Sequence, residues 1–184
     1  MLDVMRNDKR RAIFFDRDGV MLKPVVMDGR PRPPHSIAEY RALSGILSGA
    51  REAVEELRKA GFLAVLISNQ PDIAYGNISR HEWQWIQDQL KGVPFDDTFI
   101  CFHRRDDDCN CMKPKPGMLL DAAKKWNIDL ASSFLVGDTK DDVGVAAAAG
   151  CTSILVDAPY NASVQSTIRI RSLAELSRVA LQVV

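Results

Sequence analysis

The feature that most constrains the fold of this chain is a series of five short apolar runs, each of which stops abruptly at polar or turn-forming residues. The runs lie at residues 12–15, 62–68, 98–102, 133–137 and 152–157. A short apolar run between turn signals is typical of a strand that is buried on both faces, as in a parallel sheet. We therefore predict five buried strands.

Helical patterns separate the predicted strands. Ser79 with Glu82 three residues later forms a capping box, and Gly61 stands where a helix should stop. The predicted helices occupy residues 50–60, 79–90, 116–126, 141–149 and a last segment that begins near residue 172. The alternation of strand and helix predicts an α/β fold in which a parallel sheet lies between helical layers. Two segments, 23–43 and 104–116, show no such pattern, and we expect them to be irregular.

Size and charge narrow the class of protein. The 184 residues are enough for a hydrophobic core, and we expect residues 1–184 to form a single domain. The 24 Lys and Arg residues balance 24 Asp and Glu residues, which disfavours a nucleic-acid partner. No apolar run approaches the roughly 18 residues of a membrane span, so we expect no membrane partner. Residues 1–11 are charged and lack the apolar core of a secretory signal, so we expect a cytoplasmic protein. We expect these residues to form a flexible N-terminal segment and the protein to be a monomer.

Carboxylates gather at the ends of two predicted strands. Asp16 and Asp18 follow the first apolar run, and Asp138 follows the fourth, with Asp141 and Asp142 close behind. Ligands of parallel sheets bind outside the carboxyl ends of the strands, so these side chains should meet in one crevice. The first pair alone fits a solvated turn equally well, but carboxylates that converge from two strands repel one another unless a cation neutralises them. The pattern predicts a site for a hard cation, Mg²⁺.

Groups that bind anions end other predicted elements. Ser68 and Asn69 end the second run and offer a hydroxyl and an amide, and Lys113 and Lys115 precede a predicted helix. Phosphoryl transfer requires a metal, an ammonium group and hydrogen-bond donors around a reactive carboxylate, because charge spreads over the transferring oxygens. The ordered set predicts an enzyme that acts on phosphate esters.

A separate set of potential metal ligands lies in and beside the second irregular segment. The ligands are Cys101, His103, Cys109 and Cys111. Their paired spacing is typical of a tetrahedral zinc site. Because the protein fills all four positions, we expect a structural Zn²⁺ that orders the polar loop over residues 101–111, called the zinc loop below. Cys151 starts the fifth run and is expected in the core.

Four stretches carry a resemblance to a known family: DRDG at 16–19, SNQ at 68–70, KPKPG at 113–117 and GDTKDD at 137–142. In this order they resemble the motifs of the haloacid-dehalogenase superfamily of phosphatases, over roughly residues 12–160. The zinc-loop pattern is similar to that of a narrower group without a large cap domain, the heptose-1,7-bisphosphate 7-phosphatases and histidinol-phosphate phosphatases. The resemblance implies the Rossmann-like three-layer fold of that superfamily.

The resemblance also implies a role for each motif residue. Asp16 would be the nucleophile that forms an aspartyl-phosphate, and Asp18 would be the general acid and base. Mg²⁺ would be held by Asp16, the backbone carbonyl of Asp18 and Asp138, with support from Asp142. The residues that would cradle the transferring phosphate are Ser68, Asn69 and Lys113.

The chain departs from that group at three positions where relatives often carry arginine or lysine. These positions hold Tyr75, Met112 and Thr139. In an enzyme for a bisphosphate such cations would face the second phosphate, and each charge-assisted contact contributes about 1.5–3 kcal/mol. We therefore expect weaker selectivity for a second phosphate, unless a nearby cation compensates. The cations available are Lys115, Lys140, Arg104 and Arg105, and the residues predicted to contact substrate are Tyr75, Met112, Lys115, Thr139 and Lys140.

The expected function is removal of the C7 phosphate from D-glycero-D-manno-heptose 1,7-bisphosphate, a small phosphorylated sugar. Histidinol phosphate or another small sugar phosphate is the alternative substrate. A zinc-stabilised binding module without catalysis is the alternative of another class, and the intact Asp16, Lys113 and Asp138 argue against it.

Overall fold

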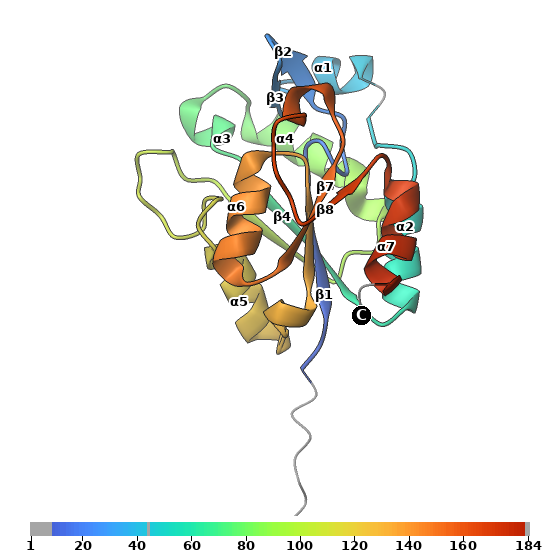
Figure 1. Ribbon diagram of the computed structural model, residues 1–184. Coiled ribbons are helices and arrows are strands. Elements are labelled where there is room, and N and C mark those ends of the chain that lie inside the picture. The colour runs from blue at the N-terminus through green and yellow to red at the C-terminus, as the bar shows by residue number, and fades with distance from the viewer. Residues whose placement is uncertain (1–8, 44, 183–184) are drawn as a thin grey trace, which may run out of the picture.

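Six strands form the central sheet of the computed structural model, which describes residues 9–43 and 45–182 (Figure 1). Their order is β5-β4-β1-β6-β7-β8, and every neighbouring pair runs parallel. The strands are β1 (Ala12–Asp16), β4 (Leu63–Asn69), β5 (Asp97–Cys101), β6 (Phe134–Gly137), β7 (Thr152–Val156) and β8 (Ile168–Ile170). The five apolar runs coincide with the first five of these strands, which confirms the predicted α/β fold. The edge strand β8 escaped prediction because its three residues form no apolar run.

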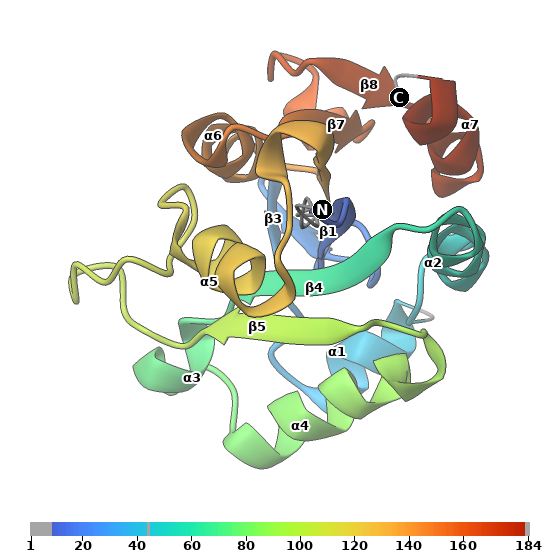
Figure 2. The same cartoon turned by 90° about the horizontal axis from the view of Figure 1, so that it is seen from below.

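Helices cover both faces of the sheet (Figure 2). Those on one face are α2 (Ala50–Lys59), α4 (Arg80–Asp88) and α7 (Leu176–Gln182), and those on the other are α5 (Gly117–Trp126) and α6 (Lys140–Ala149). Alternate residues of β1 divide between the two cores, with Ile13 and Phe15 in one and Ala12 and Phe14 in the other. Burial of each Phe contributes about 1.5–3 kcal/mol. Burial on both faces explains why β1 is a continuous apolar run in the sequence.

Shorter elements complete the fold. They are α1 (Ile37–Ala42), α3 (Asp72–Tyr75) and the 3₁₀ turns η1 (Gln89–Gly92), η2 (Leu130–Ser132), η3 (Pro159–Asn161) and η4 (Leu173–Glu175).

The segment over residues 23–43 is ordered, so the expectation of an irregular segment is wrong there. An antiparallel hairpin joins β2 (Val25–Met27) and β3 (Arg30–Arg32), and α1 follows it. Between the strands, Asp28 and Gly29 have positive φ values of 49° and 72°, which a tight Asp-Gly hairpin turn requires. Figure 1 shows the hairpin above the carboxyl ends of the central strands. The described residues contain no larger cap domain there.

Residues 1–8 of the expected N-terminal segment lie outside the described residues. Arg10, near the start of the described residues, is bound to the domain through its backbone. Arg10 donates its backbone N–H to the Asn127 carbonyl at 2.8 Å and accepts from the backbone of Asp129 at 2.8 Å. None of the helices in the described ranges has the length and apolar character needed to cross a bilayer.

Candidate active site

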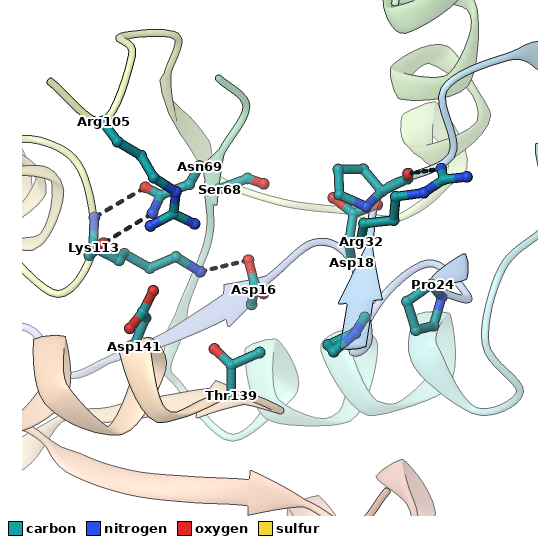
Figure 3. Close-up of a pocket in the computed structure, with 12 residues that line it drawn as sticks. Asp16, Asp18, Pro24, Arg32, Ser68, Asn69, Arg105, Lys113, Thr139 and Asp141 are labelled. Carbon is teal, nitrogen blue, oxygen red and sulfur yellow. Dashed lines mark hydrogen bonds and ion pairs between the residues drawn. The ribbon is translucent and has the colours of Figure 1, made fainter. Parts of the chain in front are cut away.

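Three neighbouring strands carry the predicted catalytic residues to one edge of the sheet. β1 ends at Asp16, β4 ends at Ser68 and Asn69, and Asp138 directly follows β6. Because β1 lies between β4 and β6 and all three run parallel, their carboxyl ends open at the same edge. A pocket of about 140 Å³ lies there, and Lys113 reaches into it toward Asp16 (Figure 3).

A buried acidic cluster lies at the carboxyl ends of these strands. Asp16, Asp138 and Asp142 are buried, and one carboxylate oxygen of each lies within 4.8 Å of the others. Burial raises the pKa of Asp16 to about 7, and the charges of Asp142 and Asp18 add to this effect although Lys113 opposes it. Burial also raises the pKa of Asp138 well above its ordinary value.

The acidic cluster fits a divalent cation. Asp138 Oδ1 is buried and has no hydrogen-bond partner among the described residues, so an oxygen is left available as a ligand. A hard cation bound by carboxylate oxygens would offset the mutual repulsion and the desolvation of Asp16 and Asp138. The carboxylate of Asp18 is not in this cluster, and its backbone carbonyl is the group that the sequence predicted as a ligand.

A glycine allows the chain to pass close to the acidic cluster. Gly19 follows Asp18 with a φ of +100°, and a Cβ at this position would lie 2.0 Å from Asp138 Oδ2. A side chain at this position would therefore displace the Asp138 carboxylate as well as strain the backbone.

Lys113 is the buried cation of the site. Its Nζ lies 2.7 Å from Asp16 Oδ1 and 2.6 Å from Asp142 Oδ1. Burial alone would lower the pKa of Lys113, but the charges of Asp142 and Asp16 outweigh it and raise the pKa. Asn69 fixes the lysine backbone, because its amide donates to the Lys113 carbonyl at 3.0 Å and accepts from the Lys113 N–H at 2.9 Å.

Asp142 orients the lysine and caps a helix. Its Oδ2 accepts from the Thr139 hydroxyl at 2.6 Å and from the backbone N–H groups of Thr139 and Asp138 at 3.0 and 3.2 Å. These bonds close the first turn of α6. Asp142 therefore supports the site mainly by holding Lys113.

A buried network holds the Asp18 carboxylate. Arg17, only 1% exposed, donates from Nε to Asp18 Oδ2 at 2.9 Å. Gln70 donates from Nε2 to the same oxygen at 2.8 Å and to Ser68 Oγ at 2.8 Å. Gln70 Oε1 accepts from Arg17 at 2.8 Å and from the Trp83 indole at 3.0 Å. Sequence reasoning missed Arg17 and Gln70, although both lie inside the DRDG and SNQ motifs.

Two further residues, after β7, support Asp138. The Tyr160 hydroxyl donates to Asp138 Oδ2 at 2.6 Å, and the Asn161 amide donates to the Asp138 carbonyl at 2.7 Å. Sequence reasoning missed both, because no motif marks a contact across 22 or 23 residues of sequence.

The four predicted zinc ligands converge at the end of β5. Cys111 Sγ lies 3.0 Å from Cys101 Sγ, 3.6 Å from Cys109 Sγ and 3.2 Å from His103 Nδ1. Ligands around a tetrahedral Zn²⁺ stand about 3.5–3.8 Å apart, so only a small expansion of the cluster is needed. The cysteines are free thiols, and burial raises the pKa of Cys101 and of Cys111. A cation that binds thiolates fits this cluster, whereas Cys151 is buried elsewhere in the core, as predicted.

The residues predicted to contact substrate lie in different surroundings. Thr139 lines the pocket, but its hydroxyl already donates to Asp142. Met112 is buried in the core, and Lys140 is exposed at the start of α6 without lining the pocket. Arg105 of the zinc loop lines the pocket instead.

The other two predicted contacts belong to the zinc loop and its surroundings. Lys115 forms an ion pair with Asp108 of the loop. The Tyr75 hydroxyl accepts the backbone N–H of Arg105 at 2.9 Å. Neither Lys115 nor Tyr75 lines the catalytic pocket.

Comparison with known proteins extends the likeness over nearly the whole chain. Residues 32–150 match the model of the haloacid dehalogenase-like hydrolase family. A D-glycero-alpha-D-manno-heptose-1,7-bisphosphate 7-phosphatase of Photorhabdus laumondii is 32% identical, with 95% of this chain and 99% of the relative covered. A D-glycero-beta-D-manno-heptose-1,7-bisphosphate 7-phosphatase of Vibrio cholerae is 37% identical, with 79% and 80% covered. The crystal structure of a D,D-heptose 1,7-bisphosphate phosphatase from B. bronchiseptica, complexed with magnesium and phosphate, has a TM-score of 0.78 and 30% identity, with 95% and 99% covered.

Proposed function

The chain belongs to the haloacid dehalogenase-like hydrolase family and is a phosphatase, and on that premise we propose that it removes the C7 phosphate of a D-glycero-D-manno-heptose 1,7-bisphosphate with the help of Mg²⁺. The observation that carries the proposal is the buried Lys113, whose Nζ lies 2.7 Å from Asp16 Oδ1 beside the acidic cluster. The names of relatives that share nearly the full length support the sugar, and the solved relative with magnesium and phosphate supports the metal.

Asp16 is the proposed nucleophile. One of its carboxylate oxygens attacks the phosphorus of the C7 phosphate, and the bond between phosphorus and the C7 oxygen breaks. Asp18 gives its proton to the departing oxygen, so the products of this step are the sugar alcohol and an aspartyl-phosphate. Water then attacks the phosphorus, Asp18 takes a proton from that water, and the bond to Asp16 breaks to release inorganic phosphate.

The other residues bind and orient the phosphate. The Lys113 ammonium stands where the transferring oxygens gather negative charge, and the Ser68 hydroxyl lines the same pocket. Asn69 contributes by fixing the lysine backbone, because both ends of its amide are engaged there. Mg²⁺ held by Asp16 and Asp138 would neutralise charge on the phosphate and on the attacking carboxylate.

The zinc loop has a structural role in this proposal. Four protein ligands leave no open position on a tetrahedral Zn²⁺, so the ion would order the loop and take no part in hydrolysis. Three thiols kept reduced for a metal agree with a reducing compartment, and we place the reaction in the cytoplasm.

Replacement of the nucleophile tests the proposal. Asp16→Asn should lower kcat/KM by about a thousandfold or more while zinc content and melting temperature stay near those of the wild type. Asp121→Asn, an exposed position on α5, is the matched control and should keep full activity. Substantial turnover by Asp16→Asn would remove Asp16 as the nucleophile.

A side-by-side assay decides the substrate. We expect a higher kcat/KM for the heptose bisphosphate than for histidinol phosphate, and the reverse order would support the alternative substrate. No hydrolysis of any phosphomonoester in the presence of Mg²⁺ would instead support the binding module without catalysis.

A further inference from the structure

Three cationic side chains line the catalytic pocket, and two of them are already engaged by carboxylates. Lys113 contacts Asp16, and Arg32 forms a two-bond ion pair with Glu39 in which both N···O distances are 2.9 Å. The third cation is Arg105. Its guanidinium makes no ion pair or hydrogen bond with any residue that the structure describes. Arg105 is therefore the one lining cation in the described chain that is free to receive a new anion.

The Arg105 side chain points toward the catalytic residues. Figure 3 shows it extending from the zinc loop toward Lys113 and Asn69, on the side of the pocket away from the hairpin. The guanidinium lies in the same pocket as Asp16, the proposed nucleophile, but forms no ion pair with it. Arg105 and Asp16 line the same pocket, so a substrate whose first phosphate lies at Asp16 could present a second anionic group to this guanidinium.

Contacts on both sides hold the loop that carries Arg105. The backbone N–H of Arg105 donates to the Tyr75 hydroxyl at 2.9 Å. The neighbouring Arg104 donates from Nε and Nη2 to the Ala74 carbonyl at 3.2 and 3.0 Å, and its guanidinium lies 5.7 Å from the centre of the Tyr75 ring. His103, a member of the zinc-ligand cluster, directly precedes this pair. The loop therefore presents Arg105 from an anchored backbone.

The neighbouring positions cannot supply this charge. Met112 is buried and uncharged, and the Thr139 hydroxyl is engaged by Asp142. A phosphate carries close to two negative charges and pairs well with the planar fork of a guanidinium. We propose that Arg105 of the zinc loop binds the phosphate that is not transferred, and that it gives the enzyme its selectivity for a sugar with two phosphates. This inference rests on the proposed function, because it assumes that the first phosphate lies at Asp16.

Removal of the guanidinium tests the proposal. For Arg105→Ala, kcat/KM for heptose 1,7-bisphosphate should fall about 10- to 100-fold, while kcat/KM for heptose 7-phosphate should stay within about twofold. Arg105→Lys should keep part of the selectivity, since an ammonium retains the charge without the fork. Tyr75→Phe, which removes the hydroxyl that anchors Arg105, should give a smaller loss of the same kind. Arg30→Ala, an exposed arginine of the hairpin that does not line the pocket, is the matched control and should change nothing.

Zinc content is measured for every variant, and fructose 1,6-bisphosphate and fructose 6-phosphate are assayed in parallel. An equal loss on mono- and bisphosphates, or no loss on either, would overturn the role of Arg105. A wild-type enzyme that cleaves neither heptose phosphate, but whose preference for fructose bisphosphate disappears in Arg105→Ala, would refute the heptose substrate and leave the role of Arg105 standing.

Discussion

The network around Gln70 makes the sharpest prediction about catalysis. Gln70 Nε2 donates to Asp18 Oδ2 and to Ser68 Oγ, both at 2.8 Å, while its Oε1 accepts from Arg17 and Trp83. The amide thus joins the proposed general acid to a residue of the phosphate cradle. Because both donors to Oε1 are buried with it, the amide has one orientation that satisfies every partner.

The substitution Gln70→Glu tests this network, because the two side chains have almost the same size and shape. One oxygen still accepts from Arg17, but the former donor becomes an oxygen that faces Asp18 Oδ2 across 2.8 Å. Two unit charges at that separation repel by about 6 kcal/mol at an effective dielectric constant of about 20. If the pair separates, Asp18 is displaced from its position, and if it shares a proton, that proton is held between two carboxylates and is not available to the leaving oxygen. General acid–base catalysis contributes typically about 10²–10⁴-fold, so we expect kcat/KM for the sugar phosphate to fall about 100-fold.

The assay compares two leaving groups. p-Nitrophenolate departs without a proton, so kcat/KM for p-nitrophenyl phosphate should fall less than about fivefold in Gln70→Glu. Gln165→Glu, at an exposed position, is the matched control and should leave both substrates unaffected. An equal loss on both substrates would indicate general distortion of the site, and an unchanged rate on the sugar phosphate would refute the positioning role of Gln70.

Four other results are expected. Because burial raises the pKa of Asp16 to about 7 and also raises that of Asp138, Mg²⁺ must displace at least one proton at lower pH, and its calorimetric affinity should fall at least tenfold per pH unit below 7. In the metal-free protein the same raised pKa favours the protonated carboxyl, so the melting temperature should fall as pH rises from about 4 toward about 7; a pH-independent affinity and melting temperature would contradict both. Tyr160→Phe removes the donor to Asp138 Oδ2 and should weaken Mg²⁺ binding about tenfold with zinc content unchanged, so an unaltered affinity would show that this bond is dispensable. Cys111→Ser should release zinc on dialysis and lower the melting temperature, whereas full zinc retention would exclude Cys111 as a ligand.

Most of the sheet could be predicted from the sequence because each central strand is buried on both faces and is therefore an uninterrupted apolar run. The polar residues that stop these runs, such as Asp16 and Asn69, had to lie at the carboxyl ends of parallel strands. Because β4, β1 and β6 are neighbours in the sheet and run parallel, the residues at their carboxyl ends lie close together. The exceptions are elements without that signature, β8 and the hairpin β2–β3, although Asp28-Gly29 is a recognised hairpin signal.

The side chains that support the catalytic residues could not be predicted in the same way. Tyr160 contacts Asp138 from 22 residues away, and Gln70 contacts Asp18 from 52 residues away. These pairings depend on how strands and loops pack, which no local pattern specifies. Met112 is another case: its position in the motif suggested a contact with substrate, but tertiary packing buries its side chain.

The zinc-ligand cluster and the catalytic pocket share the same pieces of backbone. Cys101 pairs with Asn69 across β5 and β4, and Cys111 lies two residues before Lys113, whose backbone Asn69 holds through two hydrogen bonds. Residues 104–110 have no core of their own, and ordering each residue of such a loop costs about 1–2 kcal/mol. A structural Zn²⁺ supplies about 10–16 kcal/mol of apparent binding energy, which is enough to offset that cost. An ion bound to Cys101 and Cys111 would therefore fix both segments that meet at Asn69, so the zinc loop bears on the placement of the catalytic lysine as well as on substrate selectivity.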